Sequence, residues 1–103
     1  MNRQVRLLPA AERDLSRLTA FLSGKSLRVA TRAAETLSVA IEGLNEFAER
    51  ARSEPVHGLR ELVVRFGRDA YIVQYRVEAT LVIVARVFHS REDRSSVSSL
   101  PIK

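Results

Sequence analysis

The sequence contains no cysteine, which excludes disulfides, thiol nucleophiles and thiolate metal sites. Its two histidines, His57 and His89, lie far apart, and none of the four glycines belongs to a Gly-rich phosphate loop, so we expect no metal and no cofactor. The longest apolar run, Leu81 to Ala85, is far too short to cross a bilayer. Because no basic-then-apolar leader is present either, we expect a cytoplasmic protein without a membrane partner.

Lysine is almost absent as well, although the chain is basic. The net charge is +5, and of 17 basic residues only Lys25 and Lys103 are lysines. Arginine presents a flat, permanently charged fork that suits phosphate and carboxylate. A basic surface favours nucleic acid or an acidic protein segment as a partner. An arginine-rich host proteome explains the bias equally well, so both explanations stay open.

The apolar spacing predicts a short strand followed by two helices. Gln4–Leu8 alternates as a strand does, and Pro9 ends it. Helical periodicity then runs over Ala10–Ser23, with Gly24 expected as a left-handed C-cap. Ser26 is a good N-cap for a second helix that reaches about Arg50. Small residues on the second helix, Ala30, Ala33, Ala34 and Ala40, predict a closely packed antiparallel hairpin.

After a predicted loop at Arg52–Gly58, the apolar period changes from helical to two. Three strands follow, at Glu61–Phe66, Tyr71–Val77 and Leu81–His89. Their short turns predict an antiparallel meander, so the fold class is α+β, with the helical hairpin on one face of the sheet. We expect one domain over residues 1–93 and a Ser-rich tail without regular structure over 94–103.

Strand alternation assigns each strand a face. The side expected to meet the hairpin carries Leu62, Val64, Phe66, Tyr71, Val73, Tyr75, Val77, Leu81, Ile83, Ala85 and Val87. Arg65, Arg76 and Arg86 fall on the other face and, in ideal register, form one basic patch suited to phosphates or an acidic peptide. A solvated sheet face with interspersed charges is the plainer interpretation and the one that spacing alone favours.

His89 ends the last strand and is followed by Ser90, Arg91, Glu92 and Asp93. A histidine beside an arginine is able to act as a proton donor or to contact phosphate. A structural histidine is the more common outcome at a strand end. No nucleophile-elbow motif or serine-hydrolase triad is present.

Four segments, in this order, resemble toxins of the RelE/ParE superfamily from type II toxin–antitoxin systems. They are Val5–Ala11 with Asp14-Leu15, then Gly58–Gly67, Tyr71–Val77 and Val82–Glu92. The resemblance covers most of the chain and is closer to the ParE branch. It implies a strand, a helical hairpin and a three-stranded meander, the same order that periodicity predicts.

The superfamily includes RelE-like enzymes that cut messenger RNA on the ribosome and ParE-like toxins that poison DNA gyrase. Arg91 falls where many members of both branches carry arginine. Ile72 falls where RNA-cleaving members often carry arginine, and Val97 near where they carry a C-terminal tyrosine. Because the RNA-cleaving set is incomplete, the resemblance implies a gyrase inhibitor rather than an enzyme. An endoribonuclease with Arg91 and His89 as its catalytic candidates is the alternative, and a non-toxic binding module is the third.

The resemblance also implies partners. We expect a cognate antitoxin, ParD-like or similar, acidic and partly disordered, which forms a heterocomplex with this chain. DNA gyrase is the expected target, with ribosome-bound messenger RNA as the alternative. The candidate residues for binding target or antitoxin are Arg60, Arg65, Arg76, Arg86 and Arg91. DNA binding by the chain itself ranks lower, since no recognition helix with basic spacing is apparent.

Overall fold

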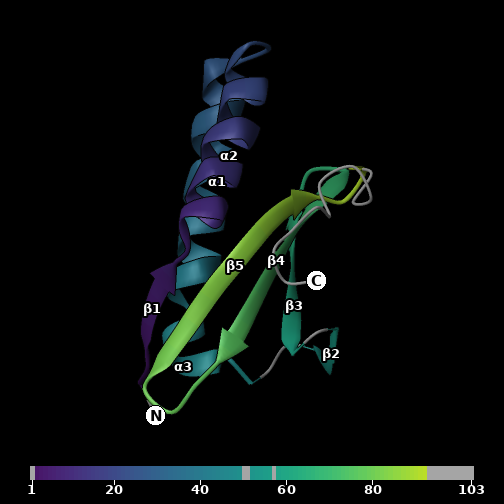
Figure 1. Cartoon of the computed structure of the whole chain (residues 1–103). Helices are drawn as coiled ribbons and strands as arrows, with labels where there is room; N and C mark the ends of the chain where they lie inside the picture. Colours follow the sequence, from purple (N-terminus) through teal and green to yellow (C-terminus); the bar gives the residue numbers. More distant parts are fainter. Residues whose placement is uncertain (1, 50–51, 57, 93–103) are drawn as a thin grey trace.

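The computed structural model describes residues 2–49, 52–56 and 58–92 as an α+β fold, with a helical hairpin beside a single sheet (Figure 1). The elements are β1 (Gln4–Leu7), α1 (Pro9–Ser23), α2 (Leu27–Glu42), α3 (Leu44–Phe47), β2 (Arg52–Val56), β3 (Leu59–Phe66), β4 (Asp69–Val77) and β5 (Leu81–His89). The strand order is β1-β5-β4-β3-β2. β1 runs parallel to β5, and β3, β4 and β5 form the predicted antiparallel meander. The predicted fold class is confirmed.

The two long helices form an antiparallel hairpin whose free end extends beyond the sheet (Figure 1). Pro9 occupies the first turn of α1, where its missing N–H costs nothing. Ser26 caps α2, because its Oγ accepts a hydrogen bond from the Val29 N–H at 3.2 Å. Small buried side chains, Ala30 and Ala33 among them, let the helices approach closely. Across the described ranges, no helix is long and apolar enough to cross a membrane.

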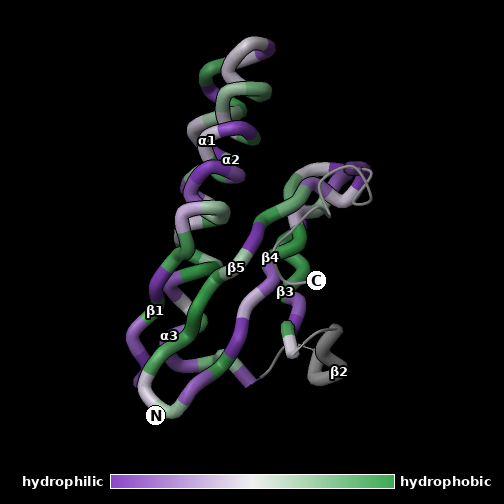
Figure 2. The backbone as a smooth tube through the Cα atoms, in the orientation of Figure 1, coloured by the Kyte–Doolittle hydropathy of each residue, from purple (hydrophilic) through white to green (hydrophobic). Residues whose placement is uncertain are grey.

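The core lies between the hairpin and one face of the sheet. On β3 and β4 the inward residues are those that alternation predicts. Figure 2 shows both hydrophilic and hydrophobic segments along these two strands. Tyr75 is fully buried there, and its hydroxyl donates a hydrogen bond to the backbone carbonyl of Ala48. Phe66 packs against the same cluster while remaining partly exposed. The phenol thereby ties the middle of the sheet to the segment after α3.

Three local predictions were wrong. Gly24 is the C-cap of α1, but its φ of −66° is right-handed, so the cap needs no glycine. The second helix ends at Glu42 rather than near Arg50, and one further turn, α3, starts after Gly43; glycine is a weak helix former. The predicted loop at Arg52–Gly58 contains β2, which pairs with the edge of β3. Pro55 lies within β2, which is possible because an edge strand tolerates proline.

The predicted faces of β5 were wrong over its first half. Tyr75 pairs with Val84 and Gln74 with Arg86, so Ala85 is one extra residue opposite no partner. Such a β-bulge shifts the alternation by one position. Val82 and Val84 therefore enter the core before the bulge, and Val87 enters it afterwards. Leu81, Ile83 and Ala85 do not belong to this core cluster.

Candidate functional site

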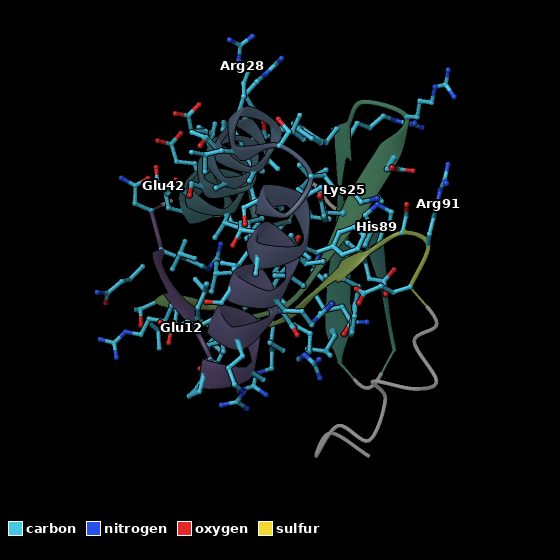
Figure 3. The ribbon with its side chains drawn as sticks, turned by 90° about the horizontal axis from the view of Figure 1, so that it is seen from above. Glu12, Lys25, Arg28, Glu42, His89 and Arg91 are labelled. Carbon is cyan, nitrogen blue, oxygen red and sulfur yellow. The ribbon has the colours of Figure 1, made fainter. Side chains whose placement is uncertain are left out.

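A pocket of about 600 Å³ lies between the second half of α1, the start of β4 and the end of β5. Lys25 reaches it from the hairpin, whereas His89 and Arg91 reach it from the end of β5 (Figure 3). The lining consists of Arg17, Leu18, Phe21, Leu22, Lys25, Asp69, Tyr71, His89, Arg91 and Glu92. The site is therefore formed by α1 of the helical hairpin on one side and by the paired ends of β4 and β5, at Asp69–Tyr71 and His89–Glu92, on the other.

One wall of the pocket is apolar and belongs mainly to α1. Leu18 is buried, Leu22 is half-buried, and Phe21 leaves 63% of its surface exposed. The Lys25 ammonium lies 4.7 Å from the centre of the Phe21 ring, a cation–π contact. An exposed aromatic side chain at the rim of a concave site is a typical anchor for a protein partner.

The opposite wall is charged, and Asp69 organises it. One carboxylate oxygen lies 2.9 Å from Arg91 Nε, and the other lies 3.4 Å from His89 Nε2. The backbone N–H of Arg91 donates a hydrogen bond to His89 Nδ1 at 3.1 Å. A neutral imidazole would therefore carry its hydrogen on Nε2, which faces Asp69. The Tyr71 ring meets the His89 ring edge-on at 5.4 Å. Burial, with the charge of Asp69, raises the pKa of Tyr71, which keeps its phenol neutral.

A second network joins the pocket to the edge of the sheet. β1 pairs only with residues 81–84 of β5, so within the described part of the chain no strand covers the edge beyond Val84. Carboxylates bind the amides of this edge instead. Asp14 accepts the Val87 N–H at 2.9 Å, and Glu92 accepts the His89 N–H at 2.8 Å. Arg17 forms ion pairs with both carboxylates.

Asp14, on the buried face of α1, is a charged residue with only 3% of its surface exposed. Arg86 binds it through two nitrogens, at 2.6 and 2.9 Å. Burial alone would raise the pKa of Asp14, but hydrogen bonds from Arg86, Val87 and Arg17 outweigh burial and hold this pKa below its ordinary value of 3.8. Asp14 is therefore a permanent anion at neutral pH.

The predicted basic patch on the outer sheet face does not assemble. Arg65, Arg76 and Arg86 do share that face, since they pair with Ala70, Ile83 and Gln74. Arg65 lies six positions along β4 from Arg76, however, which is about 20 Å in a strand.

Most of the predicted arginines are also bound to carboxylates of the same chain or lie on the other face of the sheet. The Arg86 guanidinium turns to Asp14 at the edge, and Arg76 pairs with Glu78 at 3.0 Å. Arg60 pairs with Tyr75, on the helix side of the sheet. Of the predicted candidates, the structure brings only His89 and Arg91 together, in the pocket.

Sequence reasoning missed Phe21, Lys25, Arg17 and Asp69 as site residues. Phe21 reads as a core residue, and Asp69 reads as a turn residue. Within residues 2–49, 52–56 and 58–92, no group of three acidic or histidine side chains is placed to hold a metal. His57, Val97 and the predicted tail over 94–103 lie outside the described residues.

Comparisons with known proteins agree with this architecture. The family model described as ParE toxin of type II toxin-antitoxin system, parDE, matches residues 5–94. Toxin RelE3 of Caulobacter vibrioides is 36% identical over 92 residues, which cover 89% of this chain and 99% of the relative. Toxin RelE1 of the same organism is 36% identical over 84 residues, covering 82% of this chain and 89% of the relative.

Solved structures are similar as well. The chromosomal ParDE system from P. aeruginosa matches with a TM-score of 0.73 at 18% identity, over 84% of this chain and 95% of the other, a likeness of fold alone. The RelBE2 complex from Mycobacterium tuberculosis matches with a TM-score of 0.54 at 25% identity, over 86% and 99%. The conserved hypothetical protein HP0894 from Helicobacter pylori matches with a TM-score of 0.53 at 22% identity, over 89% and 98%.

Proposed function

Because the chain belongs to the ParE toxin family of type II toxin–antitoxin systems, we propose that it inhibits DNA gyrase through protein contacts at the pocket. A cognate antitoxin neutralises it by binding the same molecule. The proposal makes the chain an inhibitor without an active site of its own. Its residues then serve to bind rather than to transfer protons.

The carrying observation is that Asp69 engages both catalytic candidates. RNA cleavage needs a base for the ribose hydroxyl, charge stabilisation at the phosphate and an acid for the leaving oxygen. Here the cation of Arg91 and the imidazole of His89 face one internal carboxylate, at 2.9 and 3.4 Å. Arg17, the next cation in the pocket, faces two more carboxylates, Asp14 and Glu92. A phosphate would have to displace these anions before any of the three could act on it.

The pocket suits a protein segment better than a phosphodiester. Its α1 wall offers the exposed Phe21 ring, with Leu18 and Leu22 beside it, to an apolar side chain of a partner. Lys25 stands at the same wall and faces no carboxylate among the described residues, so it is available to an acidic neighbour of that side chain. The net charge of +5 favours acidic partners generally, the antitoxin included.

The test is a supercoiling assay with purified gyrase, run beside growth measurements after induction of the chain alone and with its antitoxin. We expect growth arrest that the antitoxin relieves, and blocked supercoiling. Arg91→Glu should weaken inhibition by about tenfold or more, as for an interface hot spot. Arg76→Glu is the matched control, since Arg76 is also an exposed arginine with one carboxylate partner but lies outside the pocket. Equal losses in both variants would contradict the pocket assignment.

Ribosome-dependent RNA cleavage is the second candidate. It is favoured by the presence of His89 and Arg91 in one pocket, and by two relatives, 36% identical, that are named RelE toxins. Growth arrest with gyrase activity intact, together with mapped cuts in translated messages that Arg91→Ala abolishes, would establish it in place of the first. Growth that continues unchanged would leave only a non-toxic binding module.

A further inference from the structure

We propose that the free end of the helical hairpin is a contact surface for the phosphate backbone of double-stranded DNA. This hairpin tip consists of Lys25, Arg28 and Arg32, with Phe21 and Leu27 beside them. In the sequence, the segment from residue 15 to residue 34 contains four basic residues and no acidic one. One of the four, Arg17, is held by Asp14 and Glu92. The other three form the tip.

The tip gathers three cations that have no carboxylate partner among the described residues. Near the sheet, arginines bind carboxylates of the same chain: Arg3, Arg17, Arg76, Arg86 and Arg91 all do so. Among the described residues, Arg28 and Arg32 form no ion pair, and Lys25 contacts only the Phe21 ring. All three are exposed. Other exposed arginines without an ion pair among the described residues belong to separate elements: β1 (Arg6), α1 (Arg13), β3 (Arg65) and the turn after β3 (Arg68). The three cations of the tip, in contrast, lie together within residues 25–32.

The shape of the hairpin makes this charge accessible. The free ends of α1 and α2 project past the sheet (Figure 1), and the Arg28 side chain points away from the rest of the molecule (Figure 3). Arg28 and Arg32 lie one helical turn apart, about 6 Å along the axis. Each strand of duplex DNA presents one phosphate per about 3.4 Å of axis, so the two guanidiniums are able to engage separate phosphates.

An acidic protein helix would fit the tip less well. Such a helix docks through an apolar stripe, and only its rim is charged. In the first turn of α2 the exposed apolar residues, Leu27 and Val29, are two positions apart and so lie on different sides of the helix. The outward positions Arg28, Thr31 and Arg32 are polar. Backbone phosphate contacts need cations and hydroxyls but no base readout, so the absence of a recognition helix is no obstacle.

The inference goes beyond the proposed function and does not depend on it. For a toxin whose target works on DNA, a charged tip would hold the protein on the same duplex as its target. Lys25 borders both the tip and the pocket, whereas the pocket residues on β4 and at the end of β5 would remain free for protein contacts. One face of the hairpin would then bind protein while its end binds DNA.

Binding of the purified chain to a short fluorescent duplex of random sequence, measured over a range of salt concentrations, tests the proposal. The tip variant combines Lys25→Gln, Arg28→Gln and Arg32→Gln. The control variant combines Arg6→Gln, Arg13→Gln and Arg68→Gln, three exposed arginines without an ion pair among the described residues. Either triple change takes the net charge from +5 to +2. We expect the tip variant to lose about tenfold or more in affinity, and its salt slope to fall by about 3, while the control stays near the unmodified chain.

Equal losses in the two variants would overturn the proposal, because net charge alone would then explain binding. So would an unmodified chain that fails to bind the duplex, or a tip variant that loses binding to polyglutamate but keeps binding to DNA. Circular dichroism and thermal melting confirm that both variants remain folded. Because gyrase is absent from this assay, its outcome is independent of the supercoiling result.

Discussion

Asp14 in α1 and Arg86 in β5 form a two-point ion pair, at 2.6 and 2.9 Å, across 72 residues of sequence. The same carboxylate accepts the Val87 N–H, so one side chain binds both the side chain and the backbone of β5. This contact holds α1 against the edge of the sheet at the point where β1 has ended. Because the pocket lies between α1 and the end of β5, the pair also fixes the position of its two walls.

Replacement of Asp14 by asparagine should therefore be costly. Asp14→Asn removes the charge that the largely buried Arg86 binds through two nitrogens, and breaking a buried pair typically costs about 3 to 5 kcal/mol. We expect a loss of about 3 kcal/mol in the free energy of unfolding by urea. Glu12→Gln, an exposed acid in the same helix, should change it by about 0.5 kcal/mol or less. A small effect at Asp14 would mean that the pair contributes little.

The ionisation of Asp14 should also make the stability of the fold depend on pH. The pKa of Asp14 is below 3.8 in the folded chain, so below this pH the unfolded state binds a proton that the folded state does not. The stabilisation by ionised Asp14 is thus complete above about pH 4 to 5 and is lost as the pH falls through the folded pKa. The difference in melting temperature between the unmodified chain and Asp14→Asn should be constant near neutrality and shrink below pH 3.8. A difference independent of pH would contradict this account.

Tyr75 allows the hydroxyl and the ring to be tested separately. Tyr75→Phe leaves the Ala48 carbonyl without its donor, at a cost of about 1 to 3 kcal/mol for an unsatisfied buried group. Tyr75→Ala also empties a fully buried site and should cost about 3 kcal/mol or more. Denaturant titration measures both variants. Near-neutral changes would mean that the sheet face of Tyr75 is assigned wrongly.

Phe21 should matter for binding and hardly at all for folding. With 63% of its surface exposed, Phe21→Ala should leave the melting temperature almost unchanged. Its loss from the pocket rim should weaken binding of the protein target by about tenfold or more. Val39→Ala is the matched control, because Val39 is 71% exposed on α2 and does not line the pocket. Titration calorimetry with the purified target would separate the two variants, and indistinguishable affinities would argue against the pocket.

Replacing Gly67 and replacing Gly24 by alanine should have opposite effects on stability, because the two glycines differ in backbone conformation. Gly67 has a φ of +62° in the turn between β3 and β4, so Gly67→Ala should destabilise by about 1 kcal/mol or more. Gly24 has a φ of −66°, and an added Cβ would meet its nearest atom, the Phe21 carbonyl oxygen, at an ordinary 3.5 Å. Gly24→Ala should be neutral, or stabilising by about 0.4 to 1 kcal/mol, because it restricts the unfolded chain. Thermal melting of the pair distinguishes the two conformations.

The parts of the fold that follow from local periodicity were predictable. Tyr71, Val73 and Tyr75 alternate with polar or outward residues, and β4 has the face that this alternation predicts. In contrast, β5 is apolar at almost every position. Its sequence therefore carries no alternation that would reveal the bulge at Ala85. Likewise β2 depends on the available edge of β3 rather than on its own strand propensity.

The candidate site was predictable only in part, because most of its contacts are distant in sequence. His89 and Arg91 stand out as neighbours at a strand end, and they do share the pocket. Nothing local links Asp14 to Arg86, or Arg17 to Glu92, across more than 70 residues. Such pairs arise from how α1 lies on β5, which is a property of the assembled fold. The basic patch failed for the same reason, since Arg86 is drawn to a partner that strand alternation does not include.

The extra residue at Ala85 reverses the assignment of faces for the rest of β5. In a regular strand, residues three positions apart point to opposite faces. Because of the bulge, Val84 and Val87 both point into the core. Relatives that align with this strand without a gap can therefore differ in which side chains they present, if only one of them contains the bulge. Roles assigned to residues 86–89 are transferable between relatives only where both strands carry the extra residue.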